Sequence, residues 1–254
     1  MITRENLDTQ LSTYLKAGDF LLDLAWNIDA NTILQWCYDH GVMYLNTSIE
    51  EWDPYEGGSN KHPLERTLYY RHMRMRDMKS RWTKTGATAI VEHGANPGLV
   101  SHLTKRALTE IGTKALNDGL AANGVEKALE SENYPALAHA LGVKVIHIAE
   151  LDTQVSDQPK RLNEFVNTWS VEGFYEEGMA PAEMGWGTHE KKLPPRAYVH
   201  ETGPKNQISM AQPGAKTWVR SWVPDMTITG MVIRHGEAFT ISDHLTVWEG
   251  DKAI

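Results

Sequence analysis

Acidic and aromatic side chains stand together in one short segment of the chain. Residues 166–178, VNTWSVEGFYEEG, place Trp169 just before Glu172, Glu176 and Glu177. Aromatic rings usually enter a core, and carboxylates usually face water. A cation is a common partner for both, because carboxylates bind ammonium groups and ring faces attract them. The composition therefore leaves two interpretations open: packing and solvation, or a site for a positively charged small molecule.

A second segment has the same character. LNTSIEEWDPYEGG, residues 45–58, contains Thr47 and Glu50 close to Trp52 and Tyr55. A solvated acidic loop is the ordinary interpretation of such a sequence. The two rings beside the carboxylates also make this loop a candidate cation pocket.

Polar residues also follow two other predicted strands. Asn27 and Asp29 come after FLLDLAW, and Asn96 lies in EHGANPG. Because ligands of open α/β sheets bind at the carboxyl ends of the strands, these loops predict a binding site at that edge. The alternative for Asn27 and Asp29 is a cluster that caps the next helix, and Asn96 can both cap a helix and contact a ligand.

The second half of the chain adds two candidates. Glu150 ends the predicted strand VKVIHIAEL, where it could point into a cleft. His235 stands at another strand end and can act as an acid or a base near neutral pH; a structural pair with Glu237 is the alternative. No metal site is predicted, because His189 and Glu190 lack an H-E-x-x-H motif or a cysteine set.

The elements that must position the first group of residues form a predicted parallel α/β sheet. Apolar runs of strand length alternate with amphipathic segments of helix length. Asn31 and Asn96 are the expected N-caps of the second and fourth helices, and Gly41 is the expected end of the second. The apolar first strand is typical of a sheet covered on both faces. The strands are expected at residues 20–26, 42–48 and 87–93, and the helices at 6–19, 31–41, 62–82 and 96–112.

The second half is richer in Gly, Pro and Trp and predicts a different architecture. A helix is expected at residues 133–142, and mainly antiparallel strands at 143–151, 206–212, 216–223, 228–236 and 239–247. The predicted fold class is α/β with two domains. A partial Rossmann-like parallel sheet with helices occupies residues 1–115, and an α+β domain with a mainly antiparallel sheet occupies residues 116–254.

Composition and motifs narrow the functional classes. The formal net charge of −8 argues against a nucleic-acid partner, which needs a basic face on the protein. Cys37 is the only cysteine, so no intramolecular disulfide can form, and a cytoplasmic location is expected. We expect no signal peptide and no membrane span. The sequence contains no G-x-G-x-x-G, G-x-S-x-G or P-loop motif.

Several motifs, in order along nearly the whole chain, carry a family resemblance. The most specific is NTWSVEGFYEEG with the following PAEMGWGTHEK, and FLLDLAWNIDANTILQWC, YLNTSIEEW, EHGANPGLVSH and HIAELDTQ add to it. Together they resemble the bacterial homospermidine synthases of the saccharopine-dehydrogenase-like group. Members are about twice as long and begin with a Gly-rich NAD-binding turn. The resemblance therefore implies an internal fragment that lacks this turn and the C-terminal segment.

The resemblance implies an activity, a cofactor and partners. The family joins two putrescines, or putrescine and spermidine, into homospermidine and releases ammonia. Tightly bound NAD takes hydride from an amine-bearing carbon and later returns it to the imine formed with the second amine. The expected partners are thus polyamines, and the full-length form is expected to be a homodimer.

The resemblance also assigns roles to residues on the substrate side. Trp169 is the residue whose ring stabilises a cationic intermediate. Glu150 and Glu177 hold the amine ends, Glu50 lies at the cofactor edge, and His235 lies in the pocket.

On the cofactor side, the resemblance places Asn96 near the nicotinamide and the substrate. The rest of the NAD site is implied to be lined by Asn27, Asp29 and Thr47. Within residues 166–178, the remaining side chains divide by the same resemblance. Packing is expected for Phe174 and Tyr175, and solvation for Glu172 and Glu176.

Two alternatives to this function stay open. A related saccharopine or carboxyspermidine dehydrogenase would consume NAD(P)H, but its carboxylate substrates need Arg or Lys anchors, and the candidates here are acidic. The other alternative is a non-catalytic module that binds polyamines or another subunit. Calorimetry with putrescine and with NAD⁺ separates it from the enzymes.

Overall fold

The N-terminal part of the chain is built on a parallel sheet. The computed structural model describes residues 1–57, 60–150, 154–167, 170–223, 225–250 and 252–254. Strands β1 (Phe20–Asp23), β2 (Met43–Asn46) and β3 (Ala89–Ile90) pair in the order β1-β2-β3, and both pairings are parallel. These strands confirm the three predicted from the alternation of apolar and helical segments, although each is shorter than expected.

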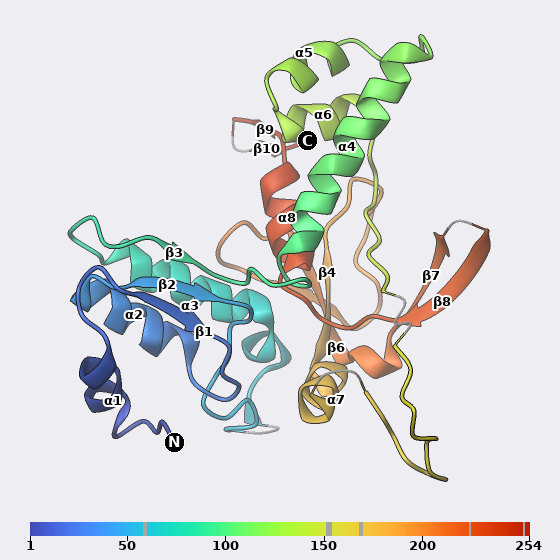
Figure 1. Cartoon of the computed structure of the whole chain (residues 1–254). Coiled ribbons are helices and arrows are strands. Elements are labelled where there is room, and N and C mark those ends of the chain that lie inside the picture. The colour runs from blue at the N-terminus through green and yellow to red at the C-terminus, as the bar shows by residue number, and fades with distance from the viewer. Residues whose placement is uncertain (58–59, 151–153, 168–169, 224, 251) are drawn as a thin grey trace.

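One face of this sheet is covered by helices. The core between them contains Leu11, Leu34, Cys37 and Tyr44, all buried. The other face, with Phe20 52% exposed, is not covered by described residues, so the prediction of a sheet covered on both faces is wrong for this part of the structure. The helices are α1 (Leu7–Tyr14), α2 (Ala30–His40) and α3 (Leu68–Ser80), with the short helix η2 (Pro63–Arg66) before α3 (Figure 1).

The C-terminal part combines a helical cluster with antiparallel strands. Its helices pack around Leu108, Val125 and Leu137, and the strands β4, β6 and β5 pair in that order as an antiparallel sheet. Strands β7 and β8 form a separate hairpin that projects from the body of the molecule (Figure 1). The helices are α4 (Leu99–Asn117), α5 (Val125–Glu130), α6 (Tyr134–Ala140), α7 (Val171–Met179) and α8 (Glu237–Leu245), with the short helix η3 (Gly214–Lys216). The strands are β4 (Pro181–Gly185), β5 (Ala197–Val199), β6 (Gln207–Pro213), β7 (Trp218–Val223), β8 (Met226–Met231), β9 (Trp248–Glu249) and β10 (Lys252–Ala253).

This architecture confirms the predicted fold class, with two local corrections. Residues 143–150 form no strand, and the segment predicted as a strand at 239–247 is mostly helix α8. The β-branched residues of that segment suggested a strand, but tertiary packing overrides such local preferences. In α8, the side chain of Phe239 is fully buried against the rings of Tyr69 and His72. The predicted domain division at residues 115–116 falls inside α4 and stays a prediction.

Two helix starts also differ from the prediction. Asp29, and not Asn31, caps α2: its carboxylate accepts a 2.7 Å hydrogen bond from the backbone N–H of Thr32. Helix α4 begins after Gly98, which has a φ of 128° that favours glycine, and not after Asn96. The predicted end of α2 at Gly41 is confirmed, with a φ of 70°.

The start of α3 joins the two parts of the chain. Glu183 on β4 accepts hydrogen bonds from the first backbone N–H groups of α3, at Leu68 (2.6 Å) and Tyr69 (3.2 Å). A carboxylate is favourable there because the N-terminal N–H groups of a helix have no partner within it. Arg76, farther along α3, forms a 2.7 Å ion pair with Asp243 on α8. Helix α3 is thus fixed against the C-terminal part, with Arg71 on the buried side.

Candidate functional site

A pocket lies where the strand ends of the parallel sheet meet the C-terminal part. Five segments line it: the loop after β2, the start of helix α3, the loop after β3, helix α7 and the segment before α8. They bring together three predicted site residues from distant parts of the sequence, namely Glu50, Glu177 and His235. Of the polar residues predicted at the strand ends of the parallel sheet, only Glu50 lies in this pocket, and Asn27, Asp29, Thr47 and Asn96 are not among its lining residues.

Helix α7 places Glu177 in this pocket. The helix begins at Ser170, whose hydroxyl accepts a 2.9 Å hydrogen bond from the N–H of Gly173. Oε2 of Glu177 is buried and has no hydrogen-bond partner among the described residues. Burial raises the pKa of Glu177 to about 8; Arg234 opposes this rise, and the nearby negative charges of Glu176 and Glu50 add to it. A buried carboxyl without a partner is a group that a cationic ligand would stabilise.

Glu50 reaches the same pocket from the loop after β2. Its carboxylate accepts a 2.8 Å hydrogen bond from the hydroxyl of Ser48. Its backbone oxygen accepts from the N–H of Ala30 (3.1 Å), which fixes the loop against the start of α2. Burial raises the pKa of Glu50, and the Ser48 hydroxyl and the charge of Arg71 act in the opposite direction. The pocket therefore contains two carboxyl groups that burial disfavours in their charged form.

Glu150 and Asn96 meet beside the pocket. The side-chain amide of Asn96 donates a 2.5 Å hydrogen bond to Oε1 of Glu150. Glu150 itself is exposed and stands on an irregular segment, so the predicted strand does not position it. Its charge raises the pKa values of Glu177 and His235, which places it within electrostatic reach of the pocket.

His235 lies half-buried in the pocket. Burial lowers its pKa, although the charges of Glu150 and Glu92 oppose this change. The lowered pKa keeps its imidazole neutral near pH 7, the form that can accept a proton. The alternative of a His235–Glu237 pair is not what forms: Glu237 accepts from the N–H of Gly98 (3.1 Å), and its other oxygen has no hydrogen bond within the described residues.

The predicted cofactor residues lie at the ends of β1 and β2. Asn27 has a φ of 60°, and its side-chain oxygen is buried with no hydrogen-bond partner in the described part of the chain. The carboxylate of Asp29 accepts from both the N–H and the hydroxyl of Thr32, each at 2.7 Å, so the capping alternative is confirmed for it. Thr47 packs on the loop at Gly94, where a side-chain Cβ in place of the glycine hydrogen would lie 3.2 Å from the Cβ of Thr47. The unpartnered oxygen of Asn27 fits a ligand that donates a hydrogen bond, such as a carboxamide.

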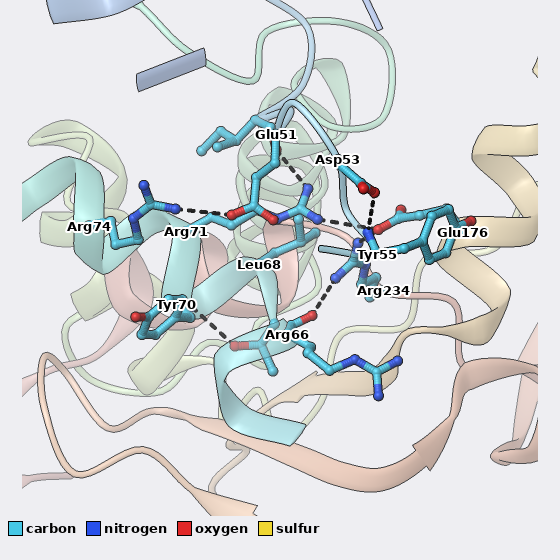
Figure 2. Close-up of polar contacts among 12 residues, drawn as sticks. Glu51, Asp53, Tyr55, Arg66, Leu68, Tyr70, Arg71, Arg74, Glu176 and Arg234 are labelled. Carbon is cyan, nitrogen blue, oxygen red and sulfur yellow. Dashed lines mark hydrogen bonds and ion pairs between the residues drawn. The ribbon is translucent and has the colours of Figure 1, made fainter. Parts of the chain in front are cut away.

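The sequence did not predict an ion-pair network in the wall of the pocket (Figure 2). Glu176 was expected to face solvent, but its side chain is only 15% exposed and pairs with both Arg71 and Arg234. Tyr175 was expected to pack, but it is exposed, whereas the predicted solvent exposure of Glu172 is confirmed. Arg234 directly precedes the predicted site residue His235, which was the one sequence feature that could have indicated a role for it. No local sequence pattern, however, predicts that Arg234 pairs with Glu176 on α7.

The sequence also did not predict a buried histidine–carboxylate pair. Nε2 of His72 on α3 lies 2.7 Å from Oε2 of Glu92, and both side chains are less than 10% exposed. Glu92 lines the pocket, and the backbone N–H of Glu92 donates to the side chain of Asn46. The pair fixes the loop after β3 against α3.

The predicted role of Trp169 is not tested by the structure, because Trp169 lies outside the described residues.

The described residues also bear on metal sites and membrane spans. Within the described ranges, no set of three or more His, Cys, Asp or Glu side chains is arranged to hold a metal ion. None of the described helices is long and apolar enough to cross a membrane.

The amino-acid sequence matches two family models in succession. Residues 1–90 match the saccharopine dehydrogenase NADP-binding domain, and residues 94–251 match the saccharopine dehydrogenase C-terminal domain. The two matches agree with the order of a parallel sheet followed by antiparallel strands.

Individual relatives are homospermidine synthases. That of Blastochloris viridis is 39% identical over 251 residues, which is 97% of this chain and 51% of the relative. That of Mesorhizobium japonicum is 38% identical over 252 residues, 97% of this chain and 50% of the relative. The crystal structure of the homospermidine synthase from Legionella pneumophila in complex with NAD matches all of this chain and 51% of its own, with a TM-score of 0.79 and 36% identity.

The chain thus spans about half the length of the curated relatives it matches. The C-terminal-domain model alone covers more than half of this chain, and the fold and the relatives agree with it. The chain belongs to the saccharopine dehydrogenase family.

Proposed function

We propose that this chain carries the polyamine pocket and part of the NAD site of a homospermidine synthase. The observation that carries the proposal is the pair of carboxyl groups, Glu50 and Glu177, in one pocket. Neither forms an ion pair with a side chain in the described structure, and Oε2 of Glu177 is buried without a hydrogen-bond partner. The names and identities of the relatives support the same function.

The charge of the pocket favours a diamine as the ligand. A buried carboxylate is costly unless a cation or hydrogen-bond donors compensate it. An alkyl diamine offers an ammonium group at each end and an apolar chain between them. In the proposed complex Glu177 and Glu150 bind the ammonium ends, and Glu50 completes the negative charge at the cofactor edge.

His235 is proposed as the group that moves a proton. An ammonium group must lose a proton before its nitrogen can attack an imine carbon, and a base must accept that proton. Burial lowers the pKa of His235, so its neutral imidazole is available near pH 7. Trp169 stays the predicted cation–π residue for the positively charged intermediate.

NAD is the proposed cofactor of this site. When bound, it would supply the acceptor and the donor of hydride, so that no net oxidation occurs. Asn96 is proposed to line its nicotinamide side, and Asn27 and Thr47 the rest of the NAD site, with the unpartnered oxygen of Asn27 as a hydrogen-bond acceptor. Asp29 is proposed to support the NAD site indirectly, because it caps α2 and its carboxylate already accepts hydrogen bonds from Thr32.

The test uses the protein as its complete reading frame encodes it. Incubation with putrescine and a catalytic amount of NAD⁺ should give homospermidine and ammonia in equal amounts, detected by mass spectrometry and an ammonia assay. A folded protein that binds NAD⁺ and putrescine but forms no homospermidine would exclude the proposed activity.

The same experiment separates the related dehydrogenases. Their carboxylate substrates need free cationic anchors, and the pocket does contain Arg71 and Arg234. Both arginines, however, already pair with Glu176. Stoichiometric oxidation of NAD(P)H during turnover would favour a dehydrogenase, and putrescine binding without NAD⁺ binding would favour a non-catalytic module.

A further inference from the structure

Two arginines line the pocket but pair away from its free carboxyl groups. Arg234 is 2% exposed and donates to the backbone oxygen of Arg66 (2.6 Å) and to Oε1 of Glu176. Arg71 on α3 is 6% exposed and donates to the backbone oxygen of Ile49 (2.9 Å) and to the same Oε1 of Glu176 (3.2 Å). One oxygen of Glu176 thus binds both guanidinium groups.

The second carboxylate partner of Arg71 lies on the outer side. Nε of Arg71 is 3.2 Å from Oε2 of Glu51, whose other oxygen pairs with the exposed Arg74 at 3.0 Å (Figure 2). Neither arginine forms an ion pair with Glu50 or Glu177 in the described part of the molecule, although all four side chains line the pocket. Glu50 and Glu177 therefore have no ion-pair partner in the described structure, because the two arginines pair with Glu176 and Glu51.

We propose that Glu176 is a positioning residue: it holds Arg234 and Arg71 away from Glu177 and Glu50, so that these two carboxyls stay available to a cationic ligand. The identity of that ligand as a polyamine rests on the proposed function. The arrangement of these side chains in the free protein does not depend on the proposed function.

Arg234 could pair with Glu177 if Glu176 lost its charge. Without the charge of Glu176, buried Arg234 would lose its ion-pair partner, and an unpaired buried charge is strongly unfavourable. Glu183 and Glu177 are carboxyls that remain within its electrostatic reach, and Glu183 already accepts hydrogen bonds from Leu68, Tyr69 and Gln207. Nε of Arg234 is buried and has no hydrogen-bond partner in the described structure, so it can still donate. Glu177, the next residue on α7, is already within electrostatic reach of Arg234. An ion pair between Arg234 and Glu177 would make the Glu177 carboxylate unavailable to a cationic ligand.

Glu176 also links the two segments that carry the free carboxyls. Arg71 contacts the loop after β2 through the oxygen of Ile49, next to Glu50. Through Arg71, Glu176 therefore connects α7, with Glu177, to that loop. The charged groups that act on Glu177 are Arg234, Glu176, Glu50 and Glu150, and the same pocket also contains Arg71, Glu92 and His235.

The test is Glu176→Gln in the 254-residue chain, which removes the charge and keeps the size. Two quantities are measured: the titration of the Glu177 carboxyl by carbon NMR, assigned with Glu177→Gln, and putrescine binding by calorimetry. We expect the pKa of Glu177 to fall from its raised value to the ordinary range or below, because Arg234 becomes its partner. Putrescine should bind about 10- to 100-fold more weakly, as expected for the loss of a charged contact.

The matched control is Glu172→Gln, which removes the same charge from an exposed position one turn earlier on α7. It should leave both quantities within about twofold of the wild type. A merely structural role for Glu176 would lower the melting temperature but leave the Glu177 titration raised, and that result would overturn the proposal. If the wild type binds putrescine and Glu176→Gln binds it with the same affinity, the proposal is overturned as well.

A second variant keeps the proposal testable if Glu176→Gln does not fold. Glu176→Gln with Arg234→Gln removes both charges, so Arg234 can no longer capture Glu177, and Arg71 keeps Glu51 as its carboxylate partner. We expect a raised Glu177 pKa and putrescine binding close to that of the wild type, and loss of binding would contradict the positioning role. If the wild type itself binds no putrescine, the proposed function fails, and the Glu177 titration in the single or the double variant still decides this inference.

Discussion

Putrescine binding by this chain should release a proton, and Glu177 should be its source. Burial raises the pKa of Glu177 to about 8, so its carboxyl is mostly protonated in the free protein at neutral pH. An ammonium group binds the ionised form. Binding must therefore remove the proton, and the apparent affinity is reduced by the fraction of protein that is already ionised.

The size of the effect follows from this pKa. With a pKa of about 8, roughly 3% of Glu177 is ionised at pH 6.5 and roughly 75% at pH 8.5. The affinity for putrescine should thus rise about 25-fold over this interval. Alkyl ammonium groups resemble that of lysine, with a pKa near 10.4, so the ligand stays charged throughout.

Calorimetry checks the prediction directly. Titrations at pH 7 in buffers with different ionisation enthalpies should report about 0.9 proton released per putrescine bound. Glu177→Gln should bind more weakly, release almost no proton and show a nearly flat affinity between pH 6.5 and 8.5. A wild-type affinity that is independent of pH, or proton release that persists in Glu177→Gln, would refute this role of the carboxyl.

The same raised pKa has a consequence for stability. The folded state binds the Glu177 proton more tightly than the unfolded state, so stability falls as the pH rises from about 4.5 towards 8. The full change is roughly 4–5 kcal/mol if no other group compensates, because each tenfold difference in proton affinity between the two states contributes about 1.36 kcal/mol. Glu177→Gln should remove this part of the slope, and urea unfolding at several pH values measures it.

Three further predictions concern other residues. Asp29→Ala should destabilise the chain by about 1 kcal/mol in urea unfolding, because it removes the N-cap of α2; Asp29→Asn, which can still cap, should cost less, and equal losses would argue against capping. Phe239→Ala should cost about 3–5 kcal/mol, because it empties a fully buried contact between α8 and α3, whereas a loss below about 1 kcal/mol would mean that the two helices do not depend on this contact. On the proposed function, Trp169→Ala in the full-length protein should lower turnover far more than Trp169→Phe, since only the latter keeps an aromatic face, and equal losses would assign Trp169 to packing.

Local sequence patterns predicted the parallel sheet because the pattern and the structure arise from the same residues. Apolar runs of strand length alternate with helical segments, and Gly41 ends α2 as its conformational freedom suggests. The pattern was less reliable at helix starts. Asp29 and Asn31 are both acceptable caps, and only the backbone geometry selected Asp29. The strand expected at 239–247 became α8 because burial of Phe239 outweighs the preference of β-branched residues.

For the candidate site too, some features follow from the sequence and others only from the tertiary structure. The sequence alone determined which residue types could bind a cation, since Glu50, Glu150 and Glu177 each follow from a motif within a few residues. It could not determine how neighbouring carboxylates share the available cations. Glu176 and Glu177 are adjacent and chemically identical, yet Glu176 binds two arginines and Glu177 lines the pocket with a buried oxygen that has no hydrogen-bond partner in the described structure. Helical geometry turns adjacent side chains in different directions, and the arginines come from α3 and from the segment before α8. Only the tertiary structure brings those charges to α7, and it therefore decides which glutamate pairs internally and which stays available to a ligand.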